Sequence, residues 1–175
     1  ELKESDFKEL YAEELANKDF VRECQLETDL ELLIPDAYIS NVAERLTIYR
    51  ELDDLDNEAQ IEQYKTQLKD RFGEIPTETI ELFNALILRK IAKKTGFEKL
   101  VLKQQKLIGY FIANQDSLFY QSDSFTKVLN YVQSNPRFCT MKERNEKLTL
   151  VFENVKSIKQ AIELIEPILQ PTVIA

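Results

Sequence analysis

The order of hydrophobic periods along the chain is the feature that most constrains its fold. From about residue 97 onward, apolar residues recur first with a period of two and then with the 3.6-residue period of a helix, and this order occurs twice. The period-two segments are Leu100 to Gln104, Leu107 to Ala113, Arg137 to Lys142 and Lys147 to Phe152. This pattern predicts a ββαββα lobe over about residues 97–170, in which helices cover a small mixed or antiparallel sheet.

The two helices of this lobe have inward-facing apolar residues at helical spacing. The inward residues of the first are Phe125, Val128, Leu129 and Val132, and those of the second are Ile158, Ile162 and Ile165. Asn154 is expected to open the second helix. A further short strand is possible at Leu118 to Tyr120.

Three capped helices are predicted before the sheet, in a lobe of about residues 36–96. The first begins at Ser40 or Asn41, with Glu44 completing a capping box on Asn41, and has Val42, Leu46, Tyr49 and Leu52 at helical spacing. The second runs from about Asn57 to Phe72, where Gly73 provides the stop. Pro76 opens the longest helix, which ends at Thr95. Apolar residues occupy most of its circumference, so we expect it to be the central helix.

The segment before these helices predicts one more strand and one more helix. Apolar residues alternate with acidic or polar ones from Cys24 to Ile34, which is typical of a half-buried strand, and Pro35 ends it. Residues 5–16 have a helical pattern behind Ser5 and Asp6. Together these elements predict an α+β fold. We interpret residues 1–20 as a tail or linker helix of a preceding module and residues 21–175 as the domain, so the chain is expected to be a piece of a longer protein.

The acidic charge is concentrated at the amino-terminal end. Residues 1–36 contain 12 acidic and 4 basic side chains, and the remainder contains 19 of each, which gives the formal charge of −8. This balance opposes general nucleic-acid binding. One alternative remains open, an accessory nucleic-acid-binding domain that uses the basic stretch of Arg89, Lys90, Lys93, Lys94, Lys99, Lys103 and Lys106. A simpler explanation of the same stretch is that its helix residues complement the negative end of the helix dipole and that its strand residues lie on a solvent-exposed face.

The residue types that most enzymes need are scarce. The chain has no histidine and only three glycines, so imidazole catalysis and a glycine-rich phosphate loop are both missing. Two distant cysteines, Cys24 and Cys139, predict neither a disulfide framework nor a metal site, and they favour a reducing compartment. The acidic cluster Asp53, Asp54, Asp56 and Glu58 lacks the spacing of a calcium loop and is expected to be a solvated linker. No cofactor, metal, catalysis or membrane segment is therefore expected, and a carboxylate-based hydrolase stays as a rival hypothesis.

Three motifs resemble the carboxy-terminal domain of the bacterial transcription-repair coupling factors. They are the entry Ile34-Pro35-Asp36-Ala37-Tyr38-Ile39, the helix Arg45-Leu46-Thr47-Ile48-Tyr49, and the junction Asp70-Arg71-Phe72-Gly73-Glu74-Ile75-Pro76. The resemblance is strongest from Leu33 to about Leu102. It implies a regulatory domain, without ATPase motifs, of a cytoplasmic ATP-dependent DNA translocase that removes stalled RNA polymerase and couples this to excision repair. It also implies docking on a UvrB-like module of the same parent chain, where the domain covers the surface that recruits UvrA.

The same resemblance implies an interface on the second helix. Gln63, Gln67 and Asp70 lie opposite its apolar stripe, where sequence pattern alone favours plain solvent exposure. Asp70 is expected to accept hydrogen bonds from arginines across the interface. The family pattern resembles Glu-x-x-Asp-Arg-Phe-Gly, and this chain has Gln67 at the first acid, so one ionic contact would become neutral. Arg71 either joins the interface or pairs internally with Asp36, Glu74 or Glu78, whereas Phe72 and Gly73 are explained by packing and helix termination.

Overall fold

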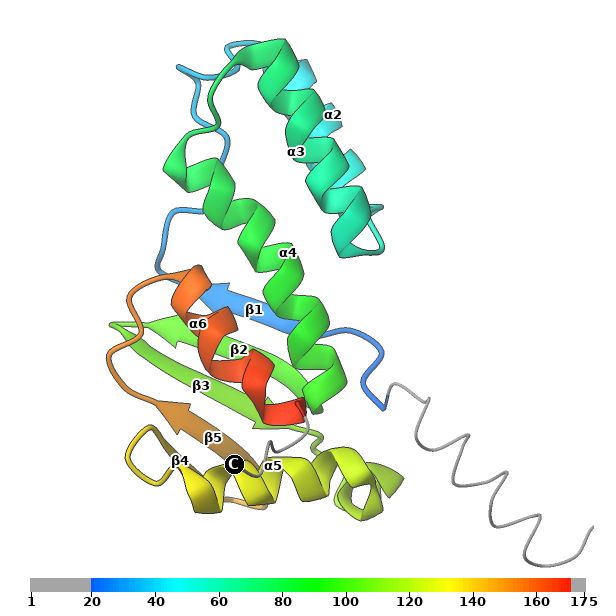
Figure 1. Cartoon of the computed structure of the whole chain (residues 1–175), viewed down its shortest axis with the longest axis vertical. Coiled ribbons are helices and arrows are strands. Elements are labelled where there is room, and N and C mark those ends of the chain that lie inside the picture. The colour runs from blue at the N-terminus through cyan, green and yellow to red at the C-terminus, as the bar shows by residue number, and fades with distance from the viewer. Residues whose placement is uncertain (1–19, 171–175) are drawn as a thin grey trace, which may run out of the picture. The chain divides into compact units, whose positions relative to one another are not determined.

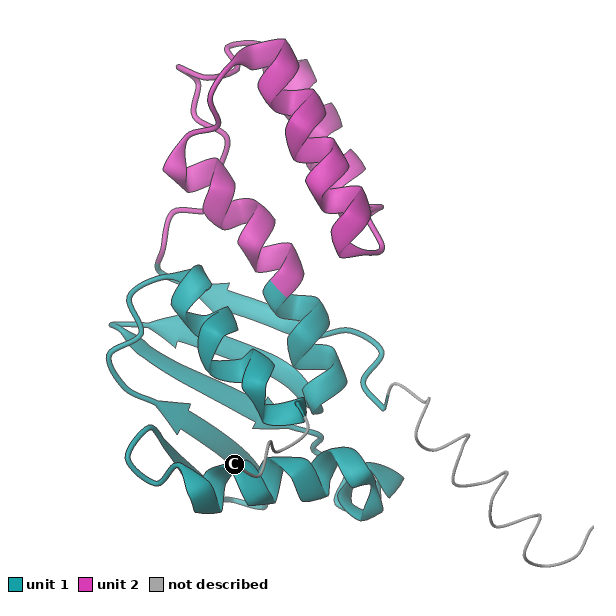
Figure 2. Cartoon of the chain, in the orientation of Figure 1, with its two compact units in different colours: residues 1–29, 88–175 teal, residues 30–87 magenta. Residues whose placement is uncertain are grey.

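The computed structural model describes residues 20–170, which form two compact units (Figure 2). The helical unit comprises residues 30–87, and the α/β unit comprises residues 20–29 and 88–170. Figure 1 shows the elements in chain order: β1 (Gln25–Thr28), α2 (Val42–Asp53), α3 (Glu58–Phe72), α4 (Thr77–Thr95), β2 (Phe97–Lys103), β3 (Lys106–Phe111), η1 (Leu118–Gln121), α5 (Asp123–Ser134), β4 (Cys139–Arg144), β5 (Lys147–Phe152), α6 (Ile158–Ile165) and η2 (Glu166–Leu169). The predicted α+β fold is confirmed, with ββαββα as the order of the carboxy-terminal half.

Local capping signals fix the helices of the helical unit. The side chain of Asn41 accepts a hydrogen bond from the backbone N–H of Glu44 at the start of α2, and Asn57 accepts one from Gln60 at the start of α3. Gly73 ends α3 at a φ of +88°, a conformation that costs glycine little. Of the two caps that the sequence allowed for α2, Ser40 and Asn41, the structure has Asn41, and the predicted helix start near Asn57 and the stop at Gly73 are confirmed.

One apolar cluster holds the helical unit together. Its fully buried members come from the entry segment and from all three helices, namely Ile34, Ile39, Ile48, Leu52, Ile61, Leu68 and Phe83. Polar contacts fix the entry segment against the helices, since Tyr49 Oη accepts a hydrogen bond from the N–H of Ile34 at 2.8 Å and Thr79 Oγ1 donates to the carbonyl of Leu33 at 3.0 Å. The two bonds thus provide partners for the Ile34 N–H and the Leu33 carbonyl, which lie outside the strands.

The α/β unit is built on a five-stranded sheet in the order β1-β2-β3-β5-β4. β1 runs parallel to β2, and the other pairs are antiparallel. The turns Gln104–Gln105 and Asn145–Glu146 have positive φ at both residues, which is typical of the type I′ turns of two-residue hairpins. β1 and β4 are the two edge strands.

The sheet has one buried and one open face. Residues of one face are almost completely buried, among them Leu100, Leu102, Leu107, Leu150 and Phe152. Buried residues of α4, α5 and α6 complete this core, including Leu88, Ala92, Val128, Ile158 and Ile165, and Figure 1 shows α4 and α6 in front of the sheet. The opposite face has Lys99, Val101, Ile108, Tyr110 and Thr149, all only partly buried. Helices therefore cover one face of the sheet.

Four sequence-based predictions of local structure are wrong. The strand predicted over Cys24 to Ile34 is only Gln25–Thr28, because β1 ends where Asp29 turns to accept a hydrogen bond from the N–H of Gln104 at 2.9 Å. The possible strand at Leu118 is the 3-10 helix η1, which Ser117 caps. Ser157, not Asn154, caps α6. Leu129, predicted to face inward, is 37% exposed.

The boundary between the units also differs from the lobes expected near residue 96. Gly96 ends α4, but the compact units divide inside that helix, between residues 87 and 88. The last turns of α4 belong to the α/β unit, as does β1, which pairs with β2. The predicted helix at residues 5–16 and the proposed linker at residues 1–20 lie largely outside the described part of the chain. Within residues 20–170, no helix is both long and apolar enough to cross a membrane.

Candidate protein-interaction site

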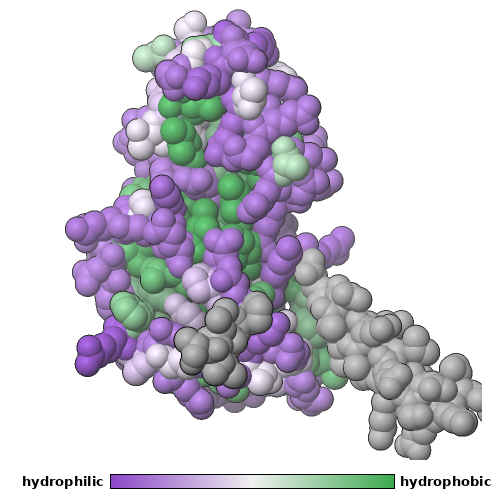
Figure 3. Space-filling model, in the orientation of Figure 1, coloured by the Kyte–Doolittle hydropathy of each residue, from purple (hydrophilic) through white to green (hydrophobic). Residues whose placement is uncertain are grey.

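The outward face of α3 carries three polar side chains that make no hydrogen bond or ion pair within residues 20–170. Gln63, Gln67 and Asp70 follow each other at spacings of four and three residues, and all three are exposed. The opposite side of the helix buries Ile61 and Leu68. Figure 3 shows a largely hydrophilic surface over this part of the helical unit. The three predicted site residues on α3 therefore form one strip that points to solvent.

The charged residues on either side of Asp70 are already engaged. Lys69 Nζ lies 3.1 Å from a carboxylate oxygen of Glu74, and Arg71 Nη2 lies 2.5 Å from Glu44 Oε1 on α2. The carboxylate of Asp70 has no hydrogen bond or ion pair with any residue of the described range 20–170. Its carboxylate is thus the one charge of this three-residue run that stays available.

Arg71 pairs internally, as one of the two sequence-based alternatives had it, but with a partner that the sequence did not identify. It pairs with Glu44, and none of the three predicted partners, Asp36, Glu74 and Glu78, holds it. The guanidinium also lies 4.8 Å from the centre of the Phe72 ring, where a cation–π contact stabilises it. Since α2 and α3 run antiparallel, the first turn of α2 meets the last turn of α3, a juxtaposition that sequence spacing does not show.

A second side-chain bond joins the last turn of α2 to the middle of α3. Tyr64 Oη donates to Glu51 Oε2 at 2.6 Å, and burial together with this carboxylate raises the pKa of the Tyr64 hydroxyl well above its usual range. Tyr38 Oη donates to the carbonyl of Gly73 at 2.8 Å, and burial raises its pKa as well. The middle and the carboxy-terminal end of α3 are therefore bonded to the rest of the helical unit, which holds the exposed strip in one orientation.

Two apolar residues of α2 were expected inside and are found outside. Val42 is 59% and Leu46 is 50% exposed, whereas the buried residues of α2 are Ile48 and Leu52. The prediction holds for Leu52 and for the partly buried Tyr49, and Ile48 completes the buried face of the helix. Val42 and Leu46, one turn apart, add an exposed apolar pair to the helical unit.

The basic stretch of residues 89–106 does not form one surface. Arg89 extends from α4 and donates to the carbonyl of Cys24 at 3.0 Å and to Glu23 at 2.7 Å. Three of its strand lysines instead lie on the open sheet face or at its edge beside carboxylates: Lys99 and Lys103 flank Glu27, and Lys106 lies near Glu153. The helix part and the strand part therefore point to different sides of the α/β unit, which weakens the nucleic-acid alternative.

Reactive and metal-binding side chains do not gather elsewhere in the described part of the chain. Across residues 20–170, no three histidine, cysteine, aspartate or glutamate side chains are placed to hold a metal ion. Cys24 and Cys139 are both buried with free thiols. Burial raises the pKa of the Cys24 thiol to about 12, so it remains protonated at neutral pH and is a poor nucleophile.

Comparison with known proteins gives one consistent answer. The family model described as the TRCF domain matches residues 28–122. The chain is 27% identical over 117 residues to the transcription-repair-coupling factor of Rickettsia prowazekii and 32% identical over 118 residues to that of Buchnera aphidicola. These matches cover 67% and 66% of this chain but 10% and 14% of the two relatives, so the chain spans only a small part of their length.

The fold agrees with a solved structure of the same kind. A crystal structure of the C-terminal domain of transcription-repair coupling factor superposes with a TM-score of 0.69, covering 84% of this chain and 92% of that one, at 22% identity. At this identity the superposition shows the fold. The family model covers more than half of the chain, including the whole of α3 with Asp70. The chain therefore belongs to the TRCF domain family of the transcription-repair coupling factors.

Proposed function

We propose that this chain is a non-catalytic regulatory domain of a transcription-coupled DNA repair protein. It docks on a UvrB-like module of its own parent chain and covers the surface that recruits the damage sensor UvrA. Release of the domain then exposes that surface when the parent, an ATP-dependent DNA translocase of the cytoplasm, engages stalled RNA polymerase. The name and family of its relatives support this setting.

The observation that carries the proposal is the free carboxylate of Asp70. The neighbouring cations Lys69 and Arg71 are each paired with an acid of this chain, so the negative charge of Asp70 is not neutralised by either of them. A carboxylate in that position accepts charge-assisted, bidentate hydrogen bonds from an arginine of a partner. Such contacts set specificity and association rate more than raw affinity. The α3 strip thus fits a partner surface that presents arginine.

The two glutamines give this interface a mixed character. Gln63 and Gln67 each offer a donor and an acceptor but no charge, so they complement Asp70 without adding repulsion. Gln67 replaces the acid expected from the resemblance, and we infer a docked state with one ionic contact fewer. Because the module is tethered in the parent, its effective concentration is on the order of millimolar, and a weak interface suffices.

Calorimetric titration of this chain with the separately purified UvrB-like module of its parent tests the proposal. Asp70→Arg is expected to weaken binding by about tenfold or more, because it places like charges across the interface. Asp53→Arg is the matched control, since it reverses an exposed charge of the same unit on α2, and it should change the affinity by less than about twofold. Equal effects of the two variants, or no binding by the wild-type chain, would contradict the proposal.

A further inference from the structure

The open face of the sheet has a hollow of about 360 Å³. Side chains of β3, β4 and β5 line it together with the turn between β4 and β5: Lys106, Ile108, Tyr110, Lys142, Arg144, Asn145, Lys147, Thr149 and Val151. Four of these nine are cationic, and none is a carboxylate. The hollow therefore combines an apolar and aromatic floor with a basic rim, on a chain whose total charge is −8.

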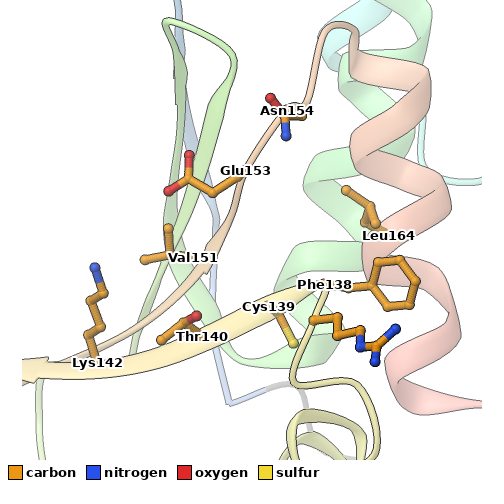
Figure 4. A pocket seen from close by; sticks show the side chains of 9 residues that line it. Phe138, Cys139, Thr140, Lys142, Val151, Glu153, Asn154 and Leu164 are labelled. Carbon is orange, nitrogen blue, oxygen red and sulfur yellow. The ribbon is translucent and has the colours of Figure 1, made fainter.

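A second hollow of about 310 Å³ continues the first along the edge strand β4. The two share Lys142 and Val151, and the second adds Arg137, Phe138 and one carboxylate, Glu153, which pairs with Lys106. Figure 4 shows Phe138 and Leu164 at one end of it and Lys142 at the other. Phe138 is 63% exposed, which is the largest exposed fraction of any large hydrophobic side chain within residues 20–170. We call the two hollows together the β4 groove.

The cations of the β4 groove are poorly compensated inside the chain. Lys106 pairs with Glu153 at 3.6 Å. Lys142, Arg144 and Lys147 form no ion pair within residues 20–170. Arg144 and Lys147 also stand directly opposite each other in the β4–β5 ladder, where like charges destabilise a sheet. Folding alone gives no reason for this arrangement, whereas an anionic partner would relieve the repulsion.

We propose that the β4 groove binds an acidic protein segment that has a bulky apolar side chain. The apolar side chain would cover Phe138, and the carboxylates of the segment would meet Lys142, Arg144 and Lys147. An exposed aromatic anchor beside a charged rim is the usual composition of a protein-binding patch. β4 is also an edge strand, whose outer backbone groups are open to pairing with an extended segment.

A single-stranded nucleic acid is the less favoured occupant. Such ligands stack successive bases on aromatic rings, and among the residues that line the first hollow Tyr110 is the one aromatic side chain. Phe138 lies at the far end, beyond Thr140 and Lys142.

This proposal concerns the α/β unit and a negatively charged partner, whereas Asp70 lies on the helical unit and is proposed to bind a partner that presents arginine. It is independent of docking through α3, and either surface can fail without the other. Charge reversal at Arg144 also separates a binding role from a structural one. Arg144→Glu places opposite charges across the hairpin from Lys147, so the melting temperature of the free chain should hold or rise while binding of an acidic segment is weakened.

Fluorescence anisotropy with a labelled peptide of about fifteen residues, rich in Glu and containing Phe and Leu, tests the groove. Arg144→Glu/Lys147→Glu is expected to weaken binding at least about tenfold, and Phe138→Ser is expected to weaken it as well. The matched control Lys156→Glu/Lys159→Glu reverses two exposed cations at and before α6 and should leave binding unchanged, as should Asp70→Arg. No saturable binding at about 100 µM peptide, or equal losses in the control, would overturn the proposal. Tighter binding of an oligothymidine of about fifteen nucleotides would overturn it in favour of nucleic acid.

Discussion

The three glycines of the chain occupy three different environments. Replacing each of them by alanine therefore separates the cost of backbone strain from the cost of overpacking. Gly73 has a φ of +88°, and a Cβ built there meets no atom within 4 Å. Gly109 has no such backbone constraint, but a Cβ would lie 2.3 Å from the Phe97 ring. Gly96 has both problems, with a φ of +100° and a Cβ 2.2 Å from the Phe119 ring.

The expected losses of stability follow from these geometries. Gly73 combines its φ of +88° with a ψ of −165°, a region that is open essentially to glycine alone, so backbone strain of about 1–3 kcal/mol is the whole effect expected for Gly73→Ala. Overpacking in a filled core costs about 1–3 kcal/mol, and for Gly109→Ala the better strand propensity of alanine offsets about 0.5–1 kcal/mol of it. Gly96→Ala combines both terms and should cost roughly 2–5 kcal/mol.

The surroundings of Phe119 explain why this ring cannot simply move aside. It is fully buried, and its centroid lies 5.3 to 6.1 Å from those of Phe20, Phe111, Tyr120 and Phe125. A shift of Phe119 therefore displaces a whole aromatic cluster. The β2–β3 hairpin begins next to Gly96, so the strain would act on the centre of the sheet.

Urea denaturation followed by circular dichroism measures the three variants against the wild-type chain. Because the chain has two compact units, amide hydrogen exchange should accompany it to separate their unfolding. Gly73→Ala should reduce protection in the helical unit, and the other two variants should reduce it in the α/β unit. A Gly96→Ala chain as stable as Gly73→Ala would refute the argument from the Phe119 contact.

Further outcomes follow from caps, buried hydroxyls and thiols. Asn57→Ala should cost about 1 kcal/mol of unfolding free energy in urea melts, because the N–H of Gln60 loses its acceptor, whereas Asn57→Asp should retain most of it. Tyr49→Phe should cost about 1–3 kcal/mol, since the N–H of Ile34 loses its bond to the hydroxyl; a neutral result would show that water replaces it. The pKa of Cys24 is raised by burial from 9.0 to about 12, so the folded state keeps a proton that the unfolded state releases. Stability should therefore be unaffected by this thiol below about pH 9 and should fall as the pH rises from there towards 12, and Cys24→Ala should flatten that slope in alkaline melts.

Local signals made the helical unit predictable. Asn41, Asn57 and Gly73 act through bonds or backbone angles within a few residues of themselves, so the sequence reveals them directly. The period-two pattern from Cys24 to Ile34 was less informative, because its first part faces the sheet core and Ile34 belongs to the core of the helical unit. One continuous alternation thus serves two separate cores, and the strand was predicted too long.

Long-range partners explain the remaining errors. The pairing of Arg71 with Glu44 joins residues that are 27 positions apart, and only the antiparallel packing of α2 and α3 brings them together. The β4 groove was missed for the same reason, since Lys106 lies far in sequence from Lys142 and Arg144. The sequence did contain one indication of the groove. Residues 142 and 144 are both cations and are two positions apart, so they lie on the same face of a strand whatever its pairing register. Reading charge along strand faces, and not only along the chain, would have found it.

The affinity of UvrA for the full-length protein that contains this domain tests the central claim most directly. If docking through Asp70 covers the UvrA surface, Asp70→Arg should release the domain and raise the affinity for UvrA, by about tenfold when the clamp contributes about 1.4 kcal/mol. Asp53→Arg should leave that affinity at the wild-type value. An affinity that Asp70→Arg does not change, measured on a variant that melts like the wild-type protein, would contradict the account.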